Sequence, residues 1–404
     1  MSAAALAADQ AGRVQALLEQ RTEANAQFFS LEAERLAALC HLMAERFARG
    51  GRLIAFGRSP AARSDARHVA VEFVHPVIVG KRALPALGLA GEGGDLEAQV
   101  DLVAQAEDIA IAFGADQAQD EGQAVRAVAV ARARGCLTVG FSPCNAEYEF
   151  EPPTDDPYIR QELVETLYHI LWELVHVFFD HRGLLAGRDA RPTHDAGASS
   201  FLYPFLAERE QKLEPVLDDV RRSALMKAQE IAALRAQTLG ENSDALIATA
   251  GALRTVFEGG RKLLALGNGG SATDAMDAVA DFRCADAGRA RRAAIDLTED
   301  ASILTAIAND IGTGAIFSRQ VIAYGLAGDA VLALSTSGNS TNVIEALVEA
   351  RRRGLLTIAM IGYDGGRVAA ESLADHVVIT RSEHIPRIQE AQASAYHTLR
   401  ELVG

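Results

Sequence analysis

The segment GGRLIAFG, residues 50–57, recurs as GGRKLLALG at residues 259–267, and this repeat decides how the rest of the chain is interpreted. Each copy is a short apolar run that follows a Gly-Gly pair. Long stretches rich in Ala, Leu and Glu with helical spacing precede the two copies, over residues 13–48 and 216–257. We therefore expect two helices followed by a strand, twice along the chain.

The parallel between the halves continues beyond these strands. KRALPALGLAG near Lys81 corresponds to RRAAIDL near Arg291, EDIAIAFGA to GDAVLALSTSG, and ARARGCLTVGFSP to ARRRGLLTIAMIGYDGG. Apolar runs of about five residues that alternate with helical patterns are typical of βαβ units and of a parallel sheet buried on both faces. Each half then ends in a predicted amphipathic helix. The sequence predicts two tandem copies of one α/β domain.

The boundary between the copies is predicted near residue 200. Residues 182–205, RGLLAGRDARPTHDAGASSFLYPF, are rich in Gly, Pro, Asp and Ser, as a linker would be. We assign residues 1–185 to the first domain, 186–209 to the linker and 210–404 to the second domain.

Composition excludes several classes of partner. The 404 residues hold 39 Lys and Arg against 54 Asp and Glu, a formal net charge of −15, which argues against nucleic acid or an anionic membrane. No CxxC pair occurs, so a disulfide framework or a cysteine-ligated zinc site is not expected. The N-terminal stretch lacks an apolar signal core, and charged or His residues interrupt the most apolar window, residues 163–179. We expect a cytoplasmic protein.

Two turns in the second half predict a phosphate site. LLALGNGGSATDA, residues 263–275, places Gly269, Gly270 and Ser271 between a strand and a helix. LALSTSGNSTNVIEAL, residues 332–347, brings hydroxyl groups and backbone N–H groups to a second helix start, without the lysine of a Walker A loop. Taken singly, most such sequences only form a turn and cap the following helix. Two of them at the carboxyl ends of parallel strands favour phosphate binding, with no nucleotide cofactor.

The motifs of the second half resemble the phosphoheptose isomerases of the sugar isomerase (SIS) superfamily. They are GNGGSATDA, LTEDASILTAIANDIG, IFSRQV, STSGNSTNV, IGYDGG and RIQE followed by His397, and they span residues 210–404 in family order. The resemblance implies two three-layer αβα SIS domains. It also implies interconversion of sedoheptulose 7-phosphate and an aldoheptose 7-phosphate, usually by homotetramers with active sites at subunit interfaces.

The resemblance carries site residues over to this chain. The expected substrate- and phosphate-binding residues are Asn268, Gly269, Gly270, Ser271, Asp300, Ser335, Thr336, Ser337, Ser340, Gln389 and His397. The family's His and Glu, which follow the first glycine turn as metal ligand and as ligand or base, are replaced by Asp277 and Asp281. Asp is shorter than Glu by about one methylene, so its carboxylate lies further from the proton that a catalytic base must reach.

The first half contains the His and Glu that the second half lacks. In the register that matches Asp65 to Asp274, His68 and Glu72 fall opposite Asp277 and Asp281. Four residues, His68, Glu72, Gln161 and His169, form an expected catalytic set that could also hold Zn²⁺ or another divalent metal. Without a metal ion, Glu72 would move a proton between C1 and C2 of the sugar, while His169 would protonate or polarise a substrate oxygen. Glu165, midway between Gln161 and His169, has no assigned role. Taken singly, these residues would be a solvated helical pair and a core histidine.

Each half therefore lacks what the other has. The second half lacks the family's His and Glu, and the first half has GRSPA and FGADQAQDEG where phosphate-binding turns would be. The carboxylates of Asp116, Asp120 and Glu121 would repel a phosphate there. We expect a sugar-phosphate isomerase with a composite site, assembled as a homodimer. Two alternatives stay open. The Asp277, Asp281, Gln389 and His397 set could form a modified site of its own, or the chain could be a non-catalytic sugar-phosphate sensor.

Overall fold

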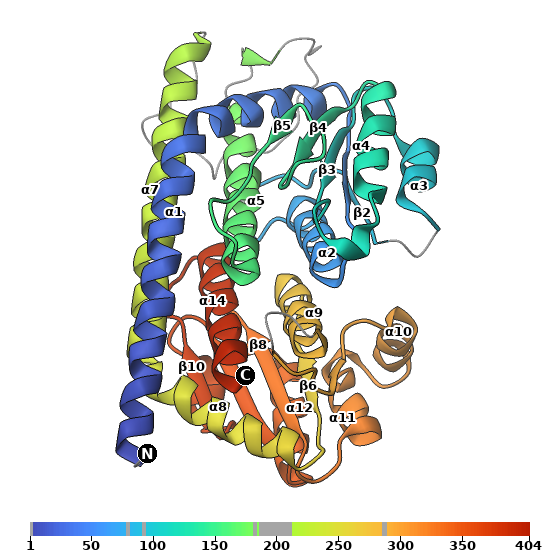
Figure 1. Ribbon diagram of the computed structural model, residues 1–404. Coiled ribbons are helices and arrows are strands. Elements are labelled where there is room, and N and C mark those ends of the chain that lie inside the picture. Colours follow the sequence, from blue (N-terminus) through green and yellow to red (C-terminus); the bar gives the residue numbers. More distant parts are fainter. Residues whose placement is uncertain (1–2, 78–80, 91–93, 181–183, 186–211, 285–288) are drawn as a thin grey trace. The chain divides into compact units, whose positions relative to one another are not determined.

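The structure is a computed structural model that describes residues 3–77, 81–90, 94–180, 184–185, 212–284 and 289–404 (Figure 1). The first half contains β1 (Leu53–Phe56), β2 (Ala86–Leu89), β3 (Ile109–Ala112), β4 (Leu137–Gly140), β5 (Tyr148–Glu149), α1 (Ala3–Ala48), α2 (Pro60–Val74), α3 (Leu96–Val103), α4 (Gln123–Ala133) and α5 (Pro157–Asp180). The predicted linker, residues 186–209, lies outside the described residues.

The second half repeats this order of elements after two leading helices. It contains α7 (Leu213–Glu241), α8 (Ser243–Glu258), β6 (Leu263–Leu266), α9 (Gly270–Arg283), β7 (Ala294–Asp296), α10 (Ala301–Asp310), α11 (Ser318–Tyr324), β8 (Ala330–Ser335), α12 (Thr341–Arg352), β9 (Leu356–Ile361), α13 (Gly366–Ala370), β10 (His376–Ile379) and α14 (Ile385–Val403).

Contacts divide the chain into two compact units. We call residues 24–230 the N-unit, and residues 1–23 together with 231–404 the C-unit. The first turns of α1 thus belong to the C-unit, while the first half of α7 belongs to the N-unit. The domain boundaries drawn from the sequence stay a prediction.

The N-unit is a parallel five-stranded sheet in the order β2-β1-β3-β4-β5. Successive strand residues point to opposite faces. Leu53 and Ala55 of β1 therefore join a core cluster with residues of α1, α2 and α5, whereas Ile54 and Phe56 join a second cluster with residues of α3 and α4. Helices cover both faces, which confirms the predicted αβα sandwich.

The C-unit has the same strand order, since β7-β6-β8-β9-β10 corresponds element by element to the N-unit sheet. Leu263 and Ala265 of β6 pack with α8, α9 and α14, and the alternate residues Leu264 and Leu266 pack with α11 and α12. The identical topology confirms that the two halves are copies of one fold.

The expectation of two helices ahead of each strand is wrong for the first half. There α1 runs without a break from Ala3 to Ala48, whereas α7 ends at Glu241 and α8 begins at Ser243. The physical difference is local. Gly240 and Asn242 interrupt the second stretch, while residues 13–48 contain no Gly or Pro that would end a helix.

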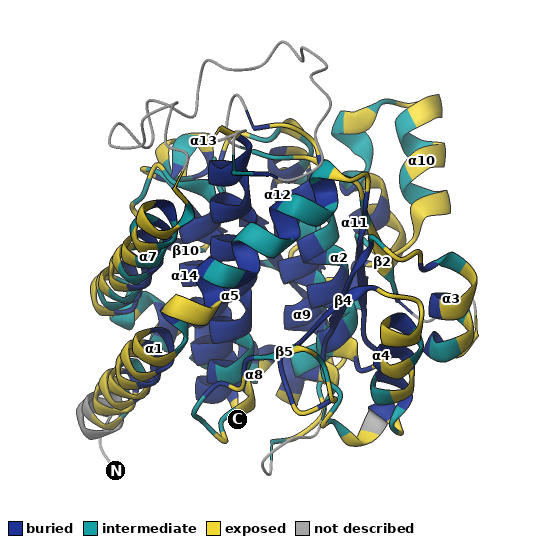
Figure 2. Cartoon of the chain, turned by 90° about the horizontal axis from the view of Figure 1, so that it is seen from above, coloured by how far each residue is buried: buried dark blue, intermediate teal, exposed yellow. Residues whose placement is uncertain are grey.

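The closing helices α5 and α14 were expected to be amphipathic, and this is also wrong. Nearly every residue of both helices is buried, including the polar residues, as their dark blue colour in Figure 2 shows. A helix that is buried all round brings its charged residues into the interior, where they must be paired or perform chemistry. Within the described part of the chain, no helix has both the length and the apolar character needed to span a bilayer.

Candidate active site

The two glycine turns of the C-unit meet at one edge of its sheet. They follow β6 and β8, which are neighbouring parallel strands, so both turns lie at the carboxyl ends of the strands. The side-chain amides of Asn268 in the first turn and Asn342 at the start of α12 donate to each other's oxygens at 3.0 and 2.9 Å. The starts of α9 and α12 are therefore tied together.

The turn between β8 and α12 is held by its own hydroxyl groups. The backbone N–H of Gly338 donates to Ser335 Oγ at 3.1 Å, and that of Asn339 donates to Ser337 Oγ at 3.2 Å. Ser340 is the N-cap of α12, yet among the described residues its side chain accepts no bond from the first turn, where the Val343 N–H donates to Asn342 Oδ1 at 2.9 Å. The start of this helix thus keeps the positive character that attracts anions.

The remaining residues that the sequence assigned to phosphate binding have separate environments. Ser271 is buried in the first turn of α9, behind Gly269, whose φ of 59° and ψ of −126° suit glycine alone. Thr336 is half-buried beside Ser335. Asp300 caps α10, because its Oδ1 accepts the N–H groups of Ser302 at 2.8 Å and Ile303 at 3.0 Å.

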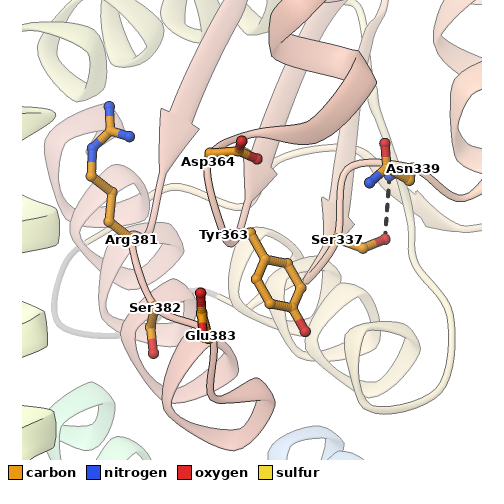
Figure 3. A pocket seen from close by; sticks show the side chains of 7 residues that line it. All are labelled: Ser337, Asn339, Tyr363, Asp364, Arg381, Ser382 and Glu383. Carbon is orange, nitrogen blue, oxygen red and sulfur yellow. Dashed lines mark hydrogen bonds between the residues drawn. The ribbon is translucent and has the colours of Figure 1, made fainter.

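A polar cavity of about 570 Å³ opens beside this turn. Figure 3 shows its lining, which consists of Ser337, Asn339, Tyr363, Asp364, Arg381, Ser382 and Glu383. Its size lies within the range of small-molecule sites, roughly 300–1,000 Å³. Ser337, Asn339, Tyr363 and Asp364 belong to motifs already quoted from the sequence. The other three lining residues follow β10 and were not selected from the sequence.

The corresponding turns of the N-unit are closed by the protein's own groups. At the start of α2, Ser59 Oγ accepts the N–H of Ala62 at 3.1 Å, and Pro60 has no N–H to offer. At the start of α4, the Asp120 carboxylate accepts the N–H of Ala124 at 3.0 Å. An anionic ligand would have to displace these caps, so neither helix start offers a phosphate site.

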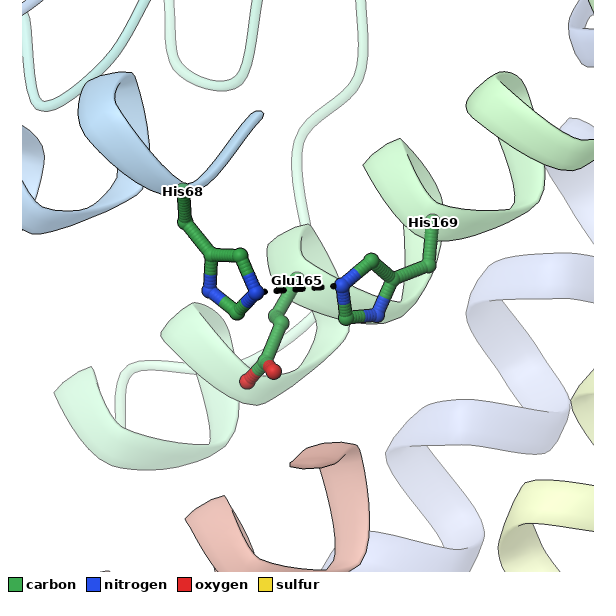
Figure 4. A group of neighbouring side chains, drawn as sticks. All are labelled: His68, Glu165 and His169. Atoms are coloured by element: carbon green, nitrogen blue, oxygen red, sulfur yellow. Dashed lines mark hydrogen bonds between the residues drawn. The ribbon is translucent and has the colours of Figure 1, made fainter. Parts of the chain in front are cut away.

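The N-unit instead brings together three side chains that can bind a metal ion (Figure 4). His68 projects from α2, whereas Glu165 and His169 project from successive turns of α5. One ligand atom from each lies within 4.8 Å of the other two, and the two Nε2 atoms of His68 and His169 are 3.3 Å apart. Glu72 lies nearby, with Oε1 4.0 Å from His68 Nε2, and Gln161 is half-buried on α5.

The N-unit group is deeply buried. His68, Glu72, Glu165 and His169 are each at most 4% exposed. Burial, aided by His169, lowers the pKa of His68 well below its ordinary value, so His68 is neutral at neutral pH. A neutral imidazole is the form that binds a metal ion. The Tyr168 ring packs edge-on against His68 and helps to fix its orientation.

A second group lies at the equivalent place in the C-unit. His397 Nε2 lies 3.4 Å from Asp277 Oδ2 and 3.3 Å from Asp281 Oδ2, and Tyr396 donates its O–H to Asp277 at 2.8 Å. Burial and the neighbouring Asp277 raise the pKa of the Asp281 carboxyl well above its ordinary value. Gln389 is buried on the same helix as His397. Two carboxylates and one imidazole suit harder cations than the N-unit group does.

From the sequence, no role was assigned to Glu165. The spacing did place it on the right face of the helix, because Gln161, Glu165 and His169 follow one another at intervals of four. The spacing could not show that His68, from α2, approaches the same turn of α5. Only the packing of α2 against α5 brings these groups together.

The fold and the paired glycine turns define an SIS-domain protein, and comparison agrees, since residues 228–362 match the model of the SIS domain. A phosphoheptose isomerase of Citrifermentans bemidjiense is 47% identical over 169 residues, which cover 41% of this chain and 85% of the relative. Another from Geobacter sp. (strain M21) is 42% identical over 193 residues, covering 46% and 95%. The chain belongs to the phosphoheptose isomerase family, with a second SIS-like domain beyond the matched half.

Solved structures resemble the whole chain in fold. The C-terminal domain of glucosamine-fructose-6-phosphate aminotransferase from Francisella tularensis has a TM-score of 0.57 at 10% identity, covering 96% of this chain and 93% of that one. The tagatose-6-phosphate ketose/aldose isomerase from Escherichia coli gives 0.55 at 12% identity, with coverage of 96% and 93%. At these identities the likeness shows the fold alone.

Proposed function

We propose that the protein is a sugar-phosphate aldose-ketose isomerase that interconverts sedoheptulose 7-phosphate and an aldoheptose 7-phosphate through an enediol. Membership of the phosphoheptose isomerase family supports the reaction class. The observation that carries the proposal is the division of labour between the units. The helix starts have fewer side-chain caps in the C-unit and are self-capped in the N-unit, whereas the family's His and Glu, His68 and Glu72, occur in the N-unit.

The phosphate is assigned to the C-unit. Ser335, Ser337 and Ser340 would present hydroxyl groups, and the starts of α9 and α12 would add backbone N–H groups. The cavity beside Ser337 would take the polyhydroxylated chain, because its lining offers hydroxyl, amide, carboxylate and guanidinium groups. A Ser337→Ala variant should raise KM more than it lowers kcat.

Without a metal ion, proton transfer is assigned to Glu72 and His169 of the N-unit. Glu72 takes a proton from C1 of the ketose, and the C–H electron pair becomes the C1–C2 double bond as His169 protonates the C2 oxygen. Glu72 then returns its proton to C2, while the O1 hydroxyl gives its proton to His169 and leaves an aldehyde at C1. With a divalent ion bound by His68 and His169, the ion would take over this role of His169, because it would polarise the carbonyl and stabilise the enediolate.

The first test is incubation with sedoheptulose 7-phosphate in deuterated water, followed by NMR. Aldose product that carries deuterium at the exchanging carbon would support the enediol reaction. Chemical-shift changes without product or exchange would refute catalysis on this sugar and favour the sensor alternative. A parallel incubation with fructose 6-phosphate controls for the choice of sugar.

A second candidate site is the Asp277, Asp281 and His397 group of the C-unit. The convergence of both carboxylates on His397 favours it, since a shared proton could move between them. In this alternative, Asp281 is the base and the N-unit group is structural. The two candidates predict opposite effects of Glu72→Gln and Asp281→Asn on deuterium exchange.

We further propose a homodimer, in which four SIS-type domains reproduce the assembly that the family resemblance implies. Light scattering on the purified chain should give a mass of twice 42.9 kDa. A monomeric mass at micromolar concentration would contradict this assembly.

A further inference from the structure

The His68, Glu165 and His169 group differs from the ligand set that the sequence indicated. That set contained Glu72 and Gln161, and it gave Glu165 no role. Among the described residues, the group whose ligand atoms all lie within 4.8 Å of one another holds Glu165 and does not hold Glu72. In Figure 4 a hydrogen bond joins the Nε2 atoms of the two imidazole rings, and the Glu165 side chain extends from α5 beside it.

The distance between the imidazole nitrogens fits a shared ion. Two nitrogens bound to one tetrahedral zinc ion, each at about 2.0–2.1 Å, would lie about 3.3 Å apart. The observed separation of His68 Nε2 and His169 Nε2 is 3.3 Å. Three protein ligands, two imidazoles and one carboxylate, leave a fourth position for a water molecule or a substrate oxygen, as catalytic zinc sites do.

The C-unit provides an internal comparison. Its group draws two carboxylates from α9 and one imidazole from α14. In the register that pairs His169 with His397, Glu165 corresponds to Ala393, which has no ligand atom. The N-unit group thus takes its carboxylate from the closing helix rather than from the helix after the first strand. Glu165 is the residue that makes this exchange possible.

We propose that Glu165 is the third protein ligand of a divalent transition-metal site in the N-unit, with His68 and His169, and that Glu72 stays outside the coordination sphere. A carboxylate bound to a divalent cation is a weaker base, because the cation stabilises its ionised form. With Glu165 as the ligand, the Glu72 carboxylate does not have to bind the ion and can act on the substrate. This last step rests on the proposed function, whereas the metal site itself does not.

The test uses the full chain, stripped with a chelator and titrated with Co²⁺, whose visible absorption reports ligand number and geometry. The wild type should bind one Co²⁺ at the N-unit site with a four-coordinate spectrum. Glu165→Gln should weaken that binding more than about a hundredfold, the upper end of the loss seen when a mere outer-shell partner is removed. Glu72→Gln should leave the affinity within about threefold of the wild type.

Two control variants separate this site from other effects. Asp277→Asn removes any contribution of the C-unit group to the titration. Glu162→Gln changes a neighbouring buried glutamate of α5 that lies outside the group and should leave Co²⁺ binding unaltered. Circular dichroism establishes that each variant is folded. If Glu165→Gln does not fold, Glu165→Asp keeps a carboxylate one methylene further from the imidazoles and should still weaken binding at least tenfold.

Three results would overturn the inference: wild-type protein that binds no Co²⁺, a folded Glu165 variant with unchanged affinity, or a loss in Glu72→Gln as large as that in Glu165→Gln. Each is independent of turnover. A protein that binds Co²⁺ through Glu165 and lacks isomerase activity would refute the proposed function while leaving the metal site intact.

Discussion

At the scale of single residues, Glu72 is the side chain on which the proposed chemistry depends. It is 2% exposed and lies near His68 in the N-unit. Glu72→Gln keeps the shape and removes the base, so we expect kcat to fall by about 10²–10⁴, the usual contribution of general acid-base catalysis. Binding of sugar phosphate, measured by calorimetry, should be unchanged.

Asp281→Asn is the matched control for this prediction, because it neutralises a carboxylate at the equivalent position of the C-unit. It should leave the rate of deuterium exchange within a few-fold of the wild type. An Asp281→Asn variant that loses exchange while Glu72→Gln retains it would move the active site to the C-unit.

Asp281 also allows a prediction of how stability depends on pH. Because its pKa is raised in the folded protein, the folded state retains a proton that the unfolded state releases above its own pKa of about 3.9. Its contribution to stability is therefore greatest below pH 4 and declines as the pH rises toward the folded-state pKa. Asp281→Asn removes this decline, so its Tm should exceed that of the wild type at pH 7.5.

The comparison is made by calorimetry in the presence of a chelator. Each kcal/mol of relieved cost corresponds to a Tm rise of about 2–4 °C for a unit of this size. The difference should shrink at pH 4.5, and exposed Asp310→Asn should show no such trend. An advantage of equal size at both pH values would contradict the assignment.

At the scale of elements, the turn between β8 and α12 depends on Gly338. Its φ is +63°, and an added Cβ would lie 2.4 Å from the Gly365 carbonyl oxygen and 2.6 Å from Ile361 Cγ2. Gly338→Ala should cost about 2–4 kcal/mol, since it adds overpacking to left-handed strain. We expect a lower Tm and weaker binding of inorganic phosphate.

Gly260→Ala separates strain from packing. Gly260 has a similar φ of +68°, but none of the described atoms lies within 4 Å of an added Cβ. Its Tm should fall less than that of Gly338→Ala. Equal losses in the two variants would mean that the close approach to Gly365 carries no energetic weight.

At the scale of the whole molecule, the N-terminal segment belongs to the C-unit although nearly the whole chain separates them in sequence. Val14 joins a C-unit core cluster, and the buried Arg21 contacts Glu401 of α14 at 3.5 Å. Breaking a buried ion pair costs about 3–5 kcal/mol, and Arg289, 3.3 Å from Glu401, should reduce this loss. We expect Arg21→Met to destabilise the C-unit by roughly 2–3 kcal/mol.

Hydrogen exchange provides the measurement. Arg21→Met should lower the protection of amides in α14 and α8, whereas Arg13→Met, at an exposed position of the same helix, should not. Protection that is unchanged in α14 would show that Arg21 does not support the C-unit.

The sequence alone determined the fold class, the duplication and the two glycine turns of the second half, because these depend on local patterns. Short apolar runs become buried strands, and Gly and Ser at a strand end start helices. The same reasoning found His68 and His169, since a repeated register aligns them with family positions. It failed for α1, where two helices were expected, and for α5 and α14, whose burial on all sides is not a local property.

Tertiary structure decided which groups meet. Whether Glu165 joins His68, and which unit residues 1–23 pack against, depend on side chains from separate elements. Spacing along one helix fixes only which residues share a face. The approach of a second helix is set by packing of the whole core, so the sequence could not show that Glu165, rather than Glu72, joins the group with His68 and His169.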